Sequence, residues 1–193
     1  MRDIIIKHGL VQDAVVLLNS EIKQGKRILV EDCSSSTMDI DTGIYPYVDS
    51  FHTTSGAVCT GLGVPEEVVE TTIGAFSVIT VLDKAFLSQV EKFPTRILDN
   101  KKIQQGLTDD YLLPQEEFAY GWTDLNLLLH AERINKLSSI FLTHVDLLDH
   151  LDEIPVCTGY RWPDGTVTPG RMPATIREFS LLEPVYETLK GWR

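Results

Sequence analysis

The sequence predicts an α/β domain built on a mainly parallel sheet with flanking helices. Segments with apolar residues at helical spacing alternate with short runs that are apolar throughout, which is the order that helices and buried strands follow in such domains. The chain has 193 residues, of which 43% are apolar. This composition suffices for one hydrophobic core, so we expect a single domain over residues 1–193.

The amino-terminal part predicts a helix, a strand and the start of a second helix. Residues 11–23 carry apolar side chains at helical spacing, and Gly25 is placed to end this helix. The apolar run from Ile28 to Val30 predicts a short buried strand. Pro65, followed by two glutamates, indicates a helical first turn, because proline and acidic residues favour that position.

The middle of the chain has a weaker pattern. Residues 75–82 fit either a strand or the end of the preceding helix. Residues 91–119 are polar and are interrupted by prolines and a glycine, so we expect mostly loop there, with one short helix.

The carboxyl-terminal half predicts a helix, a strand and another helix. A strongly amphipathic helix begins after residues 121–124, with Thr123 as its cap. Residues 139–143 form a predicted strand that is buried from Ile140 to Leu142. Residues 146–153 then form a short predicted helix.

A β-hairpin is predicted next. Residues 156–160 form its first arm, the turn lies at Pro163-Asp164-Gly165, and the second arm ends at residues 166–168.

The charge of the chain argues against several classes of partner. Its 28 acidic and 17 basic side chains give a net charge of −11, a negative field that disfavours nucleic acid and anionic lipid. The apolar runs are too short to cross a membrane, and the first residues do not resemble a secretory signal. We therefore expect a cytoplasmic protein that binds neither nucleic acid nor membranes.

The cysteines and histidines predict no metal site. Cys33, Cys59 and Cys157 are an odd number without metal-ligand spacing, which indicates reduced thiols. His144 and His150 lack a third ligand, so a zinc site is not expected.

The part of the sequence most indicative of function follows the Ile28–Val30 run. Residues 30–63 are rich in hydroxyls, carboxylates and glycines, the composition of a backbone that closes around a polar ligand. We expect residues 33–50 to line a surface cleft. The motifs Asp39-Ile40-Asp41, Tyr45-Pro46-Tyr47-Val48 and Gly56-Ala57-Val58-Cys59-Thr60-Gly61 resemble, in this order, motifs of the adenylosuccinate synthetase family.

Three later motifs extend the resemblance over residues 26–193. They are Gly121-Trp122-Thr123-Asp124, Thr143-His144-Val145-Asp146 and the segment from Pro184 to Trp192, which is similar to the family's Tyr-Glu-Thr-Leu-Pro-Gly-Trp. All the landmarks keep the family's order at nearly its spacing. The chain resembles a middle-to-late portion of the family, without the amino-terminal phosphate-loop region or the carboxyl-terminal guanine-pocket segment.

The resemblance implies GTP-dependent ligation of IMP and aspartate in purine nucleotide biosynthesis. In this reaction the γ-phosphoryl group of GTP moves to the IMP 6-oxygen and is then displaced by the aspartate amine. Complete family members are expected to use Mg²⁺ and GTP, held by a glycine-rich phosphate loop. This chain has no such loop, so we expect no catalytic residue, no metal and no cofactor in it.

Two positions that the resemblance assigns to the IMP site are substituted. Ser34 matches a glutamine that contacts IMP, and Asp49 matches a threonine that holds the IMP phosphate. A carboxylate there would repel the phosphate by about 4 kcal/mol for unit charges about 4 Å apart at an effective dielectric of about 20.

The arginine-rich loop of the family, which would hold aspartate and the IMP ribose, is also substituted. Its positions correspond to residues 113–119, where Glu116, Glu117 and Phe118 replace basic residues. The guanidinium donors are lost, and the acidic side chains would repel a dicarboxylate.

The motif Thr143-His144-Val145-Asp146 corresponds to the family's guanine site. The resemblance implies that Asp146 accepts the N1 and N2 hydrogens of guanine, while His144, in place of a lysine, lies along the ring. The alternative is that Asp146 caps a helix beginning at Leu147.

Three functions remain open at this point. The chain is a diverged synthetase homologue without ligase activity, part of an active synthetase completed by other sequence, or an interaction protein that binds a full-length subunit. The resemblance implies a homodimer, or a heterodimer with a full-length synthetase. The acidic substitutions at Asp49 and Glu116 favour the first and third functions over the second.

Overall fold

The computed structural model describes residues 2–9, 11–31, 34–84, 88, 98–111 and 117–192. The helices and 3-10 turns of this part are α1 (Arg2–Lys7), α2 (Ala14–Lys23), η1 (Ser36–Met38), α3 (Gly56–Leu62), η2 (Glu66–Val68), α5 (Lys101–Asp109), α6 (Leu125–Asn135), η3 (Val145–Leu148) and α7 (Ile176–Phe179). The strands are β1 (Ile73–Ser77), β2 (Thr80–Asp83), β3 (Phe118–Gly121), β4 (Thr123–Asp124), β5 (Ser139–Thr143), β6 (Glu153–Arg161), β7 (Val167–Thr168) and β8 (Glu183–Lys190).

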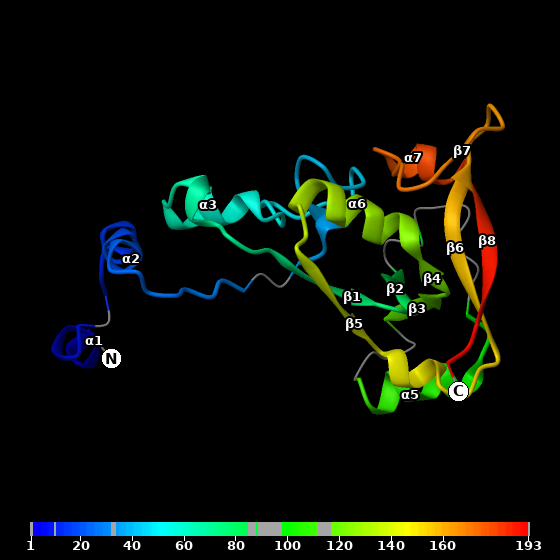
Figure 1. The fold of residues 1–193 in the computed structure, drawn as a ribbon, viewed down its shortest axis with the longest axis horizontal. Coiled ribbons are helices and arrows are strands. Elements are labelled where there is room, and N and C mark those ends of the chain that lie inside the picture. The colour runs from blue at the N-terminus through cyan, green and yellow to red at the C-terminus, as the bar shows by residue number, and fades with distance from the viewer. Residues whose placement is uncertain are drawn as a thin grey trace.

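The predicted α/β class is confirmed. Parallel pairs join β1 to β5 and β4 to β6, while antiparallel pairs join β2 to β3 and β6 to both β7 and β8. Helix α6 contacts both β1 and β6 and runs between them, as Figure 1 shows. Helices α1 and α2 project from the side of the molecule opposite the long β6–β8 ribbon (Figure 1).

Two hydrophobic clusters form the core around β6. The first cluster consists of Val78, Ile79, Leu98, Ile103, Leu107, Tyr120, Trp122, Leu148, Ile154 and Val156. The second joins β6 to α7 and consists of Ile44, Cys157, Tyr160, Trp162, Phe179 and Leu182. Tyr186 of β8 packs against both clusters, so the β6–β8 ribbon links the two parts of the core.

The predicted first helix is confirmed, but the strand expected after it is wrong. Helix α2 begins after Asp13, whose side chain accepts a hydrogen bond from the backbone N of Val16, and Gly25 follows with φ of 72°. Residues 28–30 form no strand, and Leu29 is 91% exposed. No described segment pairs with this run, and an apolar run becomes a buried strand only when a neighbour supplies hydrogen bonds and cover.

The middle of the chain contains more strand than expected. The helix expected to begin near Pro65 is only the 3-10 turn η2. Residues 75–82, which fitted either a strand or a helix end, fall in the two strands β1 and β2. The expected short helix is α5, capped by Asn100, whose side-chain oxygen accepts from the backbone N of Lys102 at 3.0 Å. Strand β3 already begins at Phe118.

The carboxyl-terminal half keeps the predicted elements with three corrections. The cap of α6 is Asp124, because Thr123 Oγ1 instead donates to the carbonyl of Val78. The strand at residues 139–143 is confirmed as β5, but all five of its residues are exposed, and β1 is its one partner among the described strands. The helix expected over residues 146–153 is the shorter η3.

The predicted hairpin is confirmed by the antiparallel pairing of β6 with β7. Strand β8, which no sequence pattern indicated, pairs with β6 over most of its length.

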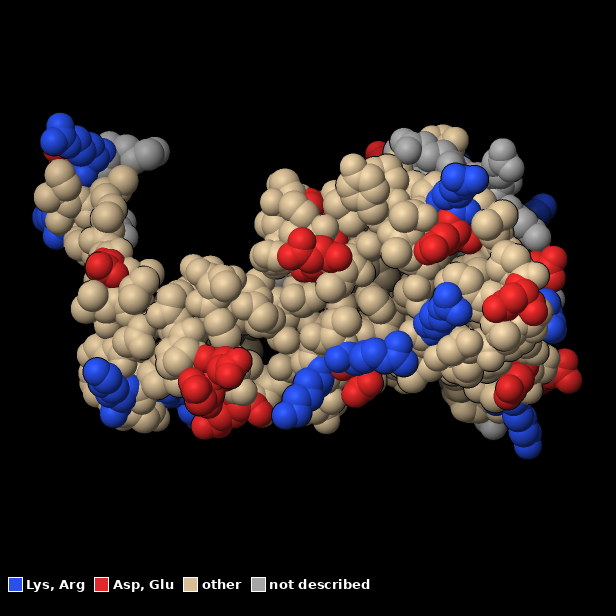
Figure 2. Space-filling view, turned by 90° about the horizontal axis from the view of Figure 1, so that it is seen from above, with Lys and Arg blue, Asp and Glu red and all other residues tan. Residues whose placement is uncertain are grey.

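Charged side chains of both signs lie on the surface. Lysines and arginines are scattered among acidic side chains on the face drawn in Figure 2. Among the described residues, no helix combines the length and apolar character needed to cross a bilayer.

Candidate functional site

The hydroxyl-rich loop is ordered around the carboxylate of Asp39. This side chain is 1% exposed and accepts hydrogen bonds from the backbone N of Asp41 and Thr42, both at 3.0 Å, and from that of Thr53 at 2.8 Å. Burial alone would raise the pKa of Asp39, but these hydrogen bonds outweigh it and lower the pKa. Asp39 therefore stays ionised and holds the loop together, as expected for a structural carboxylate.

Asn135, at the end of α6, fixes this loop to the rest of the molecule. Its side-chain oxygen accepts from the backbone N of Ser55 at 2.7 Å, and its amide nitrogen donates to Ser36 Oγ at 3.0 Å. The amino ends of β5 and β1 meet nearby, because the backbone N of Ser138 donates to the carbonyl of Thr72 at 2.8 Å. The loop therefore lies towards the amino ends of this strand pair.

The structure brings the two predicted IMP-site positions together. Ser34 Oγ donates a hydrogen bond to Asp49 Oδ2 at 3.0 Å, and both residues are half-buried. The backbone N of Asp49 donates to the carbonyl of Met38 at 2.7 Å, which fixes the position of this carboxylate. A negative charge thus occupies one of the two positions, and the hydroxyl at the other is directed to it.

The predicted guanine-site residues lie at the opposite ends of the same strands. His144 and Asp146 directly follow β5, and Ser77 ends the neighbouring β1. His144 Nδ1 lies 2.8 Å from Ser77 Oγ, and Tyr111 donates its phenolic hydrogen to Asp146 Oδ1 at 2.9 Å. A five-residue parallel pair is about 16 Å long, so this cluster is well separated from the Ser34–Asp49 pair.

Aromatic contact and hydrogen bonding set the electrostatics of this second cluster. The rings of Tyr111 and His144 meet edge to face with centroids 4.2 Å apart. Partial burial lowers the pKa of His144 against the opposing effect of Asp146, so the imidazole is neutral at pH 7. The hydrogen bond to Asp146 raises the pKa of Tyr111, which keeps the phenol protonated and donating.

Asp146 makes no side-chain cap. His144 occupies the cap position of η3, with φ of 62°, and the carboxylate of Asp146 accepts from Tyr111. The sequence did not indicate that Tyr111 and Ser77 belong to this cluster. Each lies in a separate part of the chain, and only the fold brings it to His144 and Asp146.

Of the predicted arginine-loop positions, those that the structure describes join neither cluster. Glu116 lies outside the described residues. Phe118 belongs to β3 and packs, half-buried, against the first core cluster, while Glu117 beside it is exposed. The side chain of Phe118 therefore serves the core.

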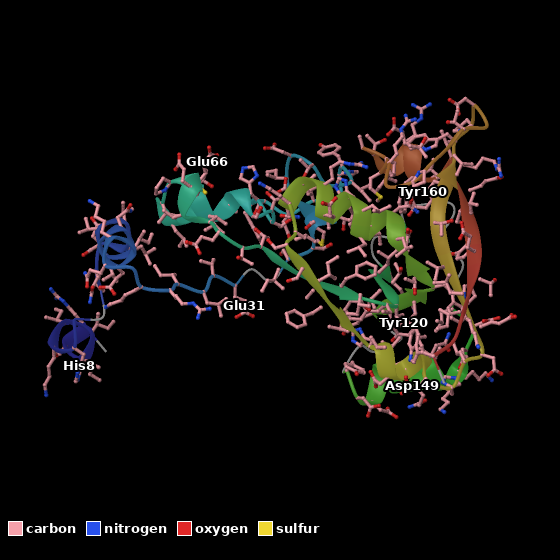
Figure 3. All side chains as sticks on the ribbon, viewed as in Figure 1. His8, Glu31, Glu66, Tyr120, Asp149 and Tyr160 are labelled. Atoms are coloured by element: carbon pink, nitrogen blue, oxygen red, sulfur yellow. The ribbon has the colours of Figure 1, made fainter. Side chains whose placement is uncertain are left out.

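A third polar group, around Asp124, is buried beneath α6. Tyr160 donates to Asp124 Oδ2, and both the backbone N and the side-chain N of Asn126 donate to Asp124 Oδ1 at 2.9 Å. Asn126 Nδ2 also lies 3.5 Å from Cys157 Sγ. Figure 3 shows Tyr160 on β6, on the side that faces α6.

Burial governs the ionisation of this group. It raises the pKa of Asp124, that of Tyr160 well above its usual value, and that of Cys157 to about 12. The Cys157 thiol is thus a poor nucleophile, and the network serves to position α6 on β6. Within the described ranges, no three histidine, cysteine or acidic side chains gather in a way that could hold a metal ion.

Comparisons of the sequence and of the structure with known proteins all find the same family. The family model described as adenylosuccinate synthetase matches residues 3–193. The adenylosuccinate synthetase of Halothermothrix orenii is 38% identical over 188 residues, covering 94% of this chain and 41% of that protein. The synthetase of Paramecium tetraurelia is 36% identical, covering 100% of this chain and 43% of that protein.

A solved structure is similar as well. The fully ligated adenylosuccinate synthetase from Plasmodium falciparum superposes with a TM-score of 0.79 at 28% identity, covering 94% of this chain and 43% of that one. The chain thus spans about two fifths of the length of these relatives.

Proposed function

Because the chain belongs to the adenylosuccinate synthetase family, we propose that it is a purine-binding member without ligase activity of its own. The observation that carries this proposal is the hydrogen bond of 3.0 Å between Ser34 and Asp49. The resemblance assigns these two residues to the family's IMP contacts, and here the serine hydroxyl donates to the carboxylate.

The Ser34–Asp49 pair argues against binding of a nucleotide phosphate. A threonine at the second position would donate a hydrogen bond to phosphate, whereas the Asp49 carboxylate only accepts. The Ser34 hydroxyl, which could donate to a ligand, donates to Asp49 instead. Phosphoryl transfer depends on aligned donors and positive charge around the phosphates, so a substituted site of this kind does not support it.

The cluster of Asp146, His144 and Tyr111 supports binding of a purine base. An exposed carboxylate can accept the two neighbouring N–H groups of guanine, and a neutral imidazole beside a phenol ring offers an aromatic contact. Tyr111 occupies one oxygen of Asp146, so a base has to displace this hydroxyl or share the carboxylate with it. We therefore expect weak binding, with a dissociation constant of about 1 mM, close to −4 kcal/mol.

The reaction itself is tested by an activity assay. The purified chain is mixed with GTP, IMP, aspartate and Mg²⁺, and formation of adenylosuccinate is followed beside the full-length Halothermothrix orenii synthetase as the positive control. We expect no turnover above the sample without protein. Turnover that disappears in an Asp146→Asn variant contradicts the proposal.

The base site is tested by calorimetric titration with guanosine, which carries no phosphate. The unaltered chain and an Asp99→Asn control, which changes an exposed aspartate outside this cluster, should bind guanosine alike. Asp146→Asn should weaken binding at least tenfold, because an amide presents a donor to the N–H groups of the base. Equal affinity in all three proteins would show that guanosine binds outside the cluster of Asp146, and would contradict the proposed base site.

A further inference from the structure

Tyr111 reaches the proposed base site from a different element than His144 and Asp146. It lies shortly after the end of α5, whereas the other two residues follow β5. Its hydroxyl donates to Asp146 Oδ1 at 2.9 Å, and its ring meets the ring of His144 edge to face with centroids 4.2 Å apart. One side chain thus contacts both residues that a base would use.

Close packing of α5 on η3 fixes the place of Tyr111. The two elements are in contact and lie side by side in Figure 1. Gly106 of α5 is so near η3 that a Cβ atom on it would lie 2.6 Å from Leu147 Cδ2. Leu107 of α5 and Leu148 of η3 both belong to the first core cluster. Because a packed core deforms little, the fold itself holds the Tyr111 hydroxyl in this position.

The two oxygens of the Asp146 carboxylate are therefore not equivalent. Oδ1 accepts the hydrogen bond from Tyr111, while no described residue donates to Oδ2. The phenol keeps its proton at neutral pH, since this hydrogen bond raises the pKa of Tyr111. A second donor at Oδ1 would share that oxygen with the phenol, so it would gain less there than at a free oxygen. The carboxylate thus offers one free acceptor and one that is already used.

This difference distinguishes two purine bases that share a 6-oxo group. Guanine presents two adjacent donors, N1–H and N2–H, and uses both carboxylate oxygens when it binds side by side with them. Hypoxanthine lacks the 2-amino group and presents N1–H alone, which Oδ2 can accept while Tyr111 stays in place. The second N–H group of guanine has to displace the phenol or give up a good acceptor, and either costs free energy.

We propose that Tyr111 sets the base selectivity of this site, by holding Asp146 Oδ1 so that the site accepts hypoxanthine at least as well as guanine. The 2-amino group of guanine adds to affinity only where the Tyr111 hydroxyl is absent. Tyr111 therefore selects the base through Asp146. The proposal rests on the proposed base site, but it does not depend on whether the chain has ligase activity.

Calorimetric titration with guanosine and with inosine, the nucleoside of hypoxanthine, tests this selectivity. The unaltered chain should bind inosine at least as tightly as guanosine. Tyr111→Phe keeps the ring and removes only the donor. It should therefore raise guanosine affinity about tenfold, the effect of one hydrogen bond to a charged group, and leave inosine affinity unchanged.

Trp192→Phe is the matched control. Trp192 Nε1 donates to Asp149 Oδ1 at 2.8 Å, so this change also removes an aromatic donor from an exposed aspartate, but outside the base site. It should alter neither affinity. Circular dichroism establishes that both variants keep the fold.

A second measurement uses the unaltered chain. With the tyrosine rings labelled, the NMR signal of Tyr111 is identified by its absence from the Tyr111→Phe spectrum. Saturating guanosine should shift this signal more than saturating inosine does, because guanosine displaces the hydroxyl from Asp146.

The outcomes separate this proposal from the base site itself. An equal gain for both nucleosides in Tyr111→Phe would show that Tyr111 obstructs the site without selecting, and no gain for guanosine would show that the hydroxyl has no effect. Either result overturns the selectivity and leaves the base site standing. Failure of all the proteins to bind either nucleoside removes the base site and the selectivity together. If Tyr111→Phe does not fold, equal shifts of the Tyr111 signal with both nucleosides, assigned through its neighbours in the chain, overturn the proposal.

Discussion

At the scale of single residues, Asp39 shows how one carboxylate shapes the loop. Asp39→Asn keeps the size of the side chain but replaces one carboxylate oxygen by an NH₂ group. This donor then faces backbone N–H groups that donate to the carboxylate in the unaltered chain. We expect a loss of about 1–3 kcal/mol in the free energy of unfolding. Asp41→Asn is the control, because the Asp41 side chain is 76% exposed. Urea unfolding at pH 7 measures both.

Asp39 also predicts the direction in which the stability of the chain changes with pH. The pKa of Asp39 is lower in the folded chain than in the unfolded one, so its contribution to stability is full at neutral pH. That contribution is lost as the pH falls through the lowered pKa. The stability difference between the unaltered chain and Asp39→Asn should therefore shrink from pH 7 towards acid. A constant difference would contradict this role.

The proximity of two candidate-site residues could be predicted from sequence because they lie within one motif. His144 and Asp146 are two positions apart and enter the same cluster. Tyr111 lies 35 positions before Asp146, and its contribution depends on where α5 ends relative to β5. No local pattern encodes that arrangement, so the partner of Asp146 was missed.

At the scale of elements, the packing of α2 on α3 depends on a glycine. Gly63 ends α3 with φ of 65°, and a Cβ atom there would lie 2.6 Å from a methyl carbon of Val15 in α2. Gly63→Ala should cost about 1–3 kcal/mol through backbone strain, with a further cost from this clash. Hydrogen exchange should then accelerate in α2.

Gly61→Ala is the matched control for that change. Gly61 lies within α3, and a Cβ atom there meets nothing within 4 Å. Alanine should stabilise the helix by up to about 1 kcal/mol. If both variants loosen α2 equally, the contact between Gly63 and Val15 does not hold the two helices together.

The apolar runs show why strand burial could not be predicted. Residues 28–30 and 140–142 are both short and apolar, and both were expected to be buried strands. Among the residues that the structure describes, only the second run pairs with another strand, β1, and it still stays exposed. Pairing and burial depend on distant segments, which the composition of a run does not specify. Strand β8 was not predicted for a related reason: it is a strand because it pairs with β6, and its own sequence does not specify that pairing.

At the scale of the whole molecule, fold class was predictable because helical and strand patterns alternate along the chain. The division of the strands into separate sheets could not be predicted, because it depends on which strand edges meet in the folded chain. The family was indicated by short motifs in order. The contact between Ser34 and Asp49 could be found only in the structure, which shows the two side chains hydrogen-bonded to each other.

Calorimetric titration with IMP tests the central proposal most directly, that Asp49 occupies the phosphate position of an IMP site and repels the phosphate. The unaltered chain should bind IMP no more tightly than about 1 mM. Asp49→Thr should improve IMP affinity at least tenfold at low salt and leave inosine unaffected, and the gain should shrink as salt screens the charge over about 10 Å at 0.1 M. Micromolar IMP affinity in the unaltered chain, or no gain in Asp49→Thr at low salt, would contradict the account.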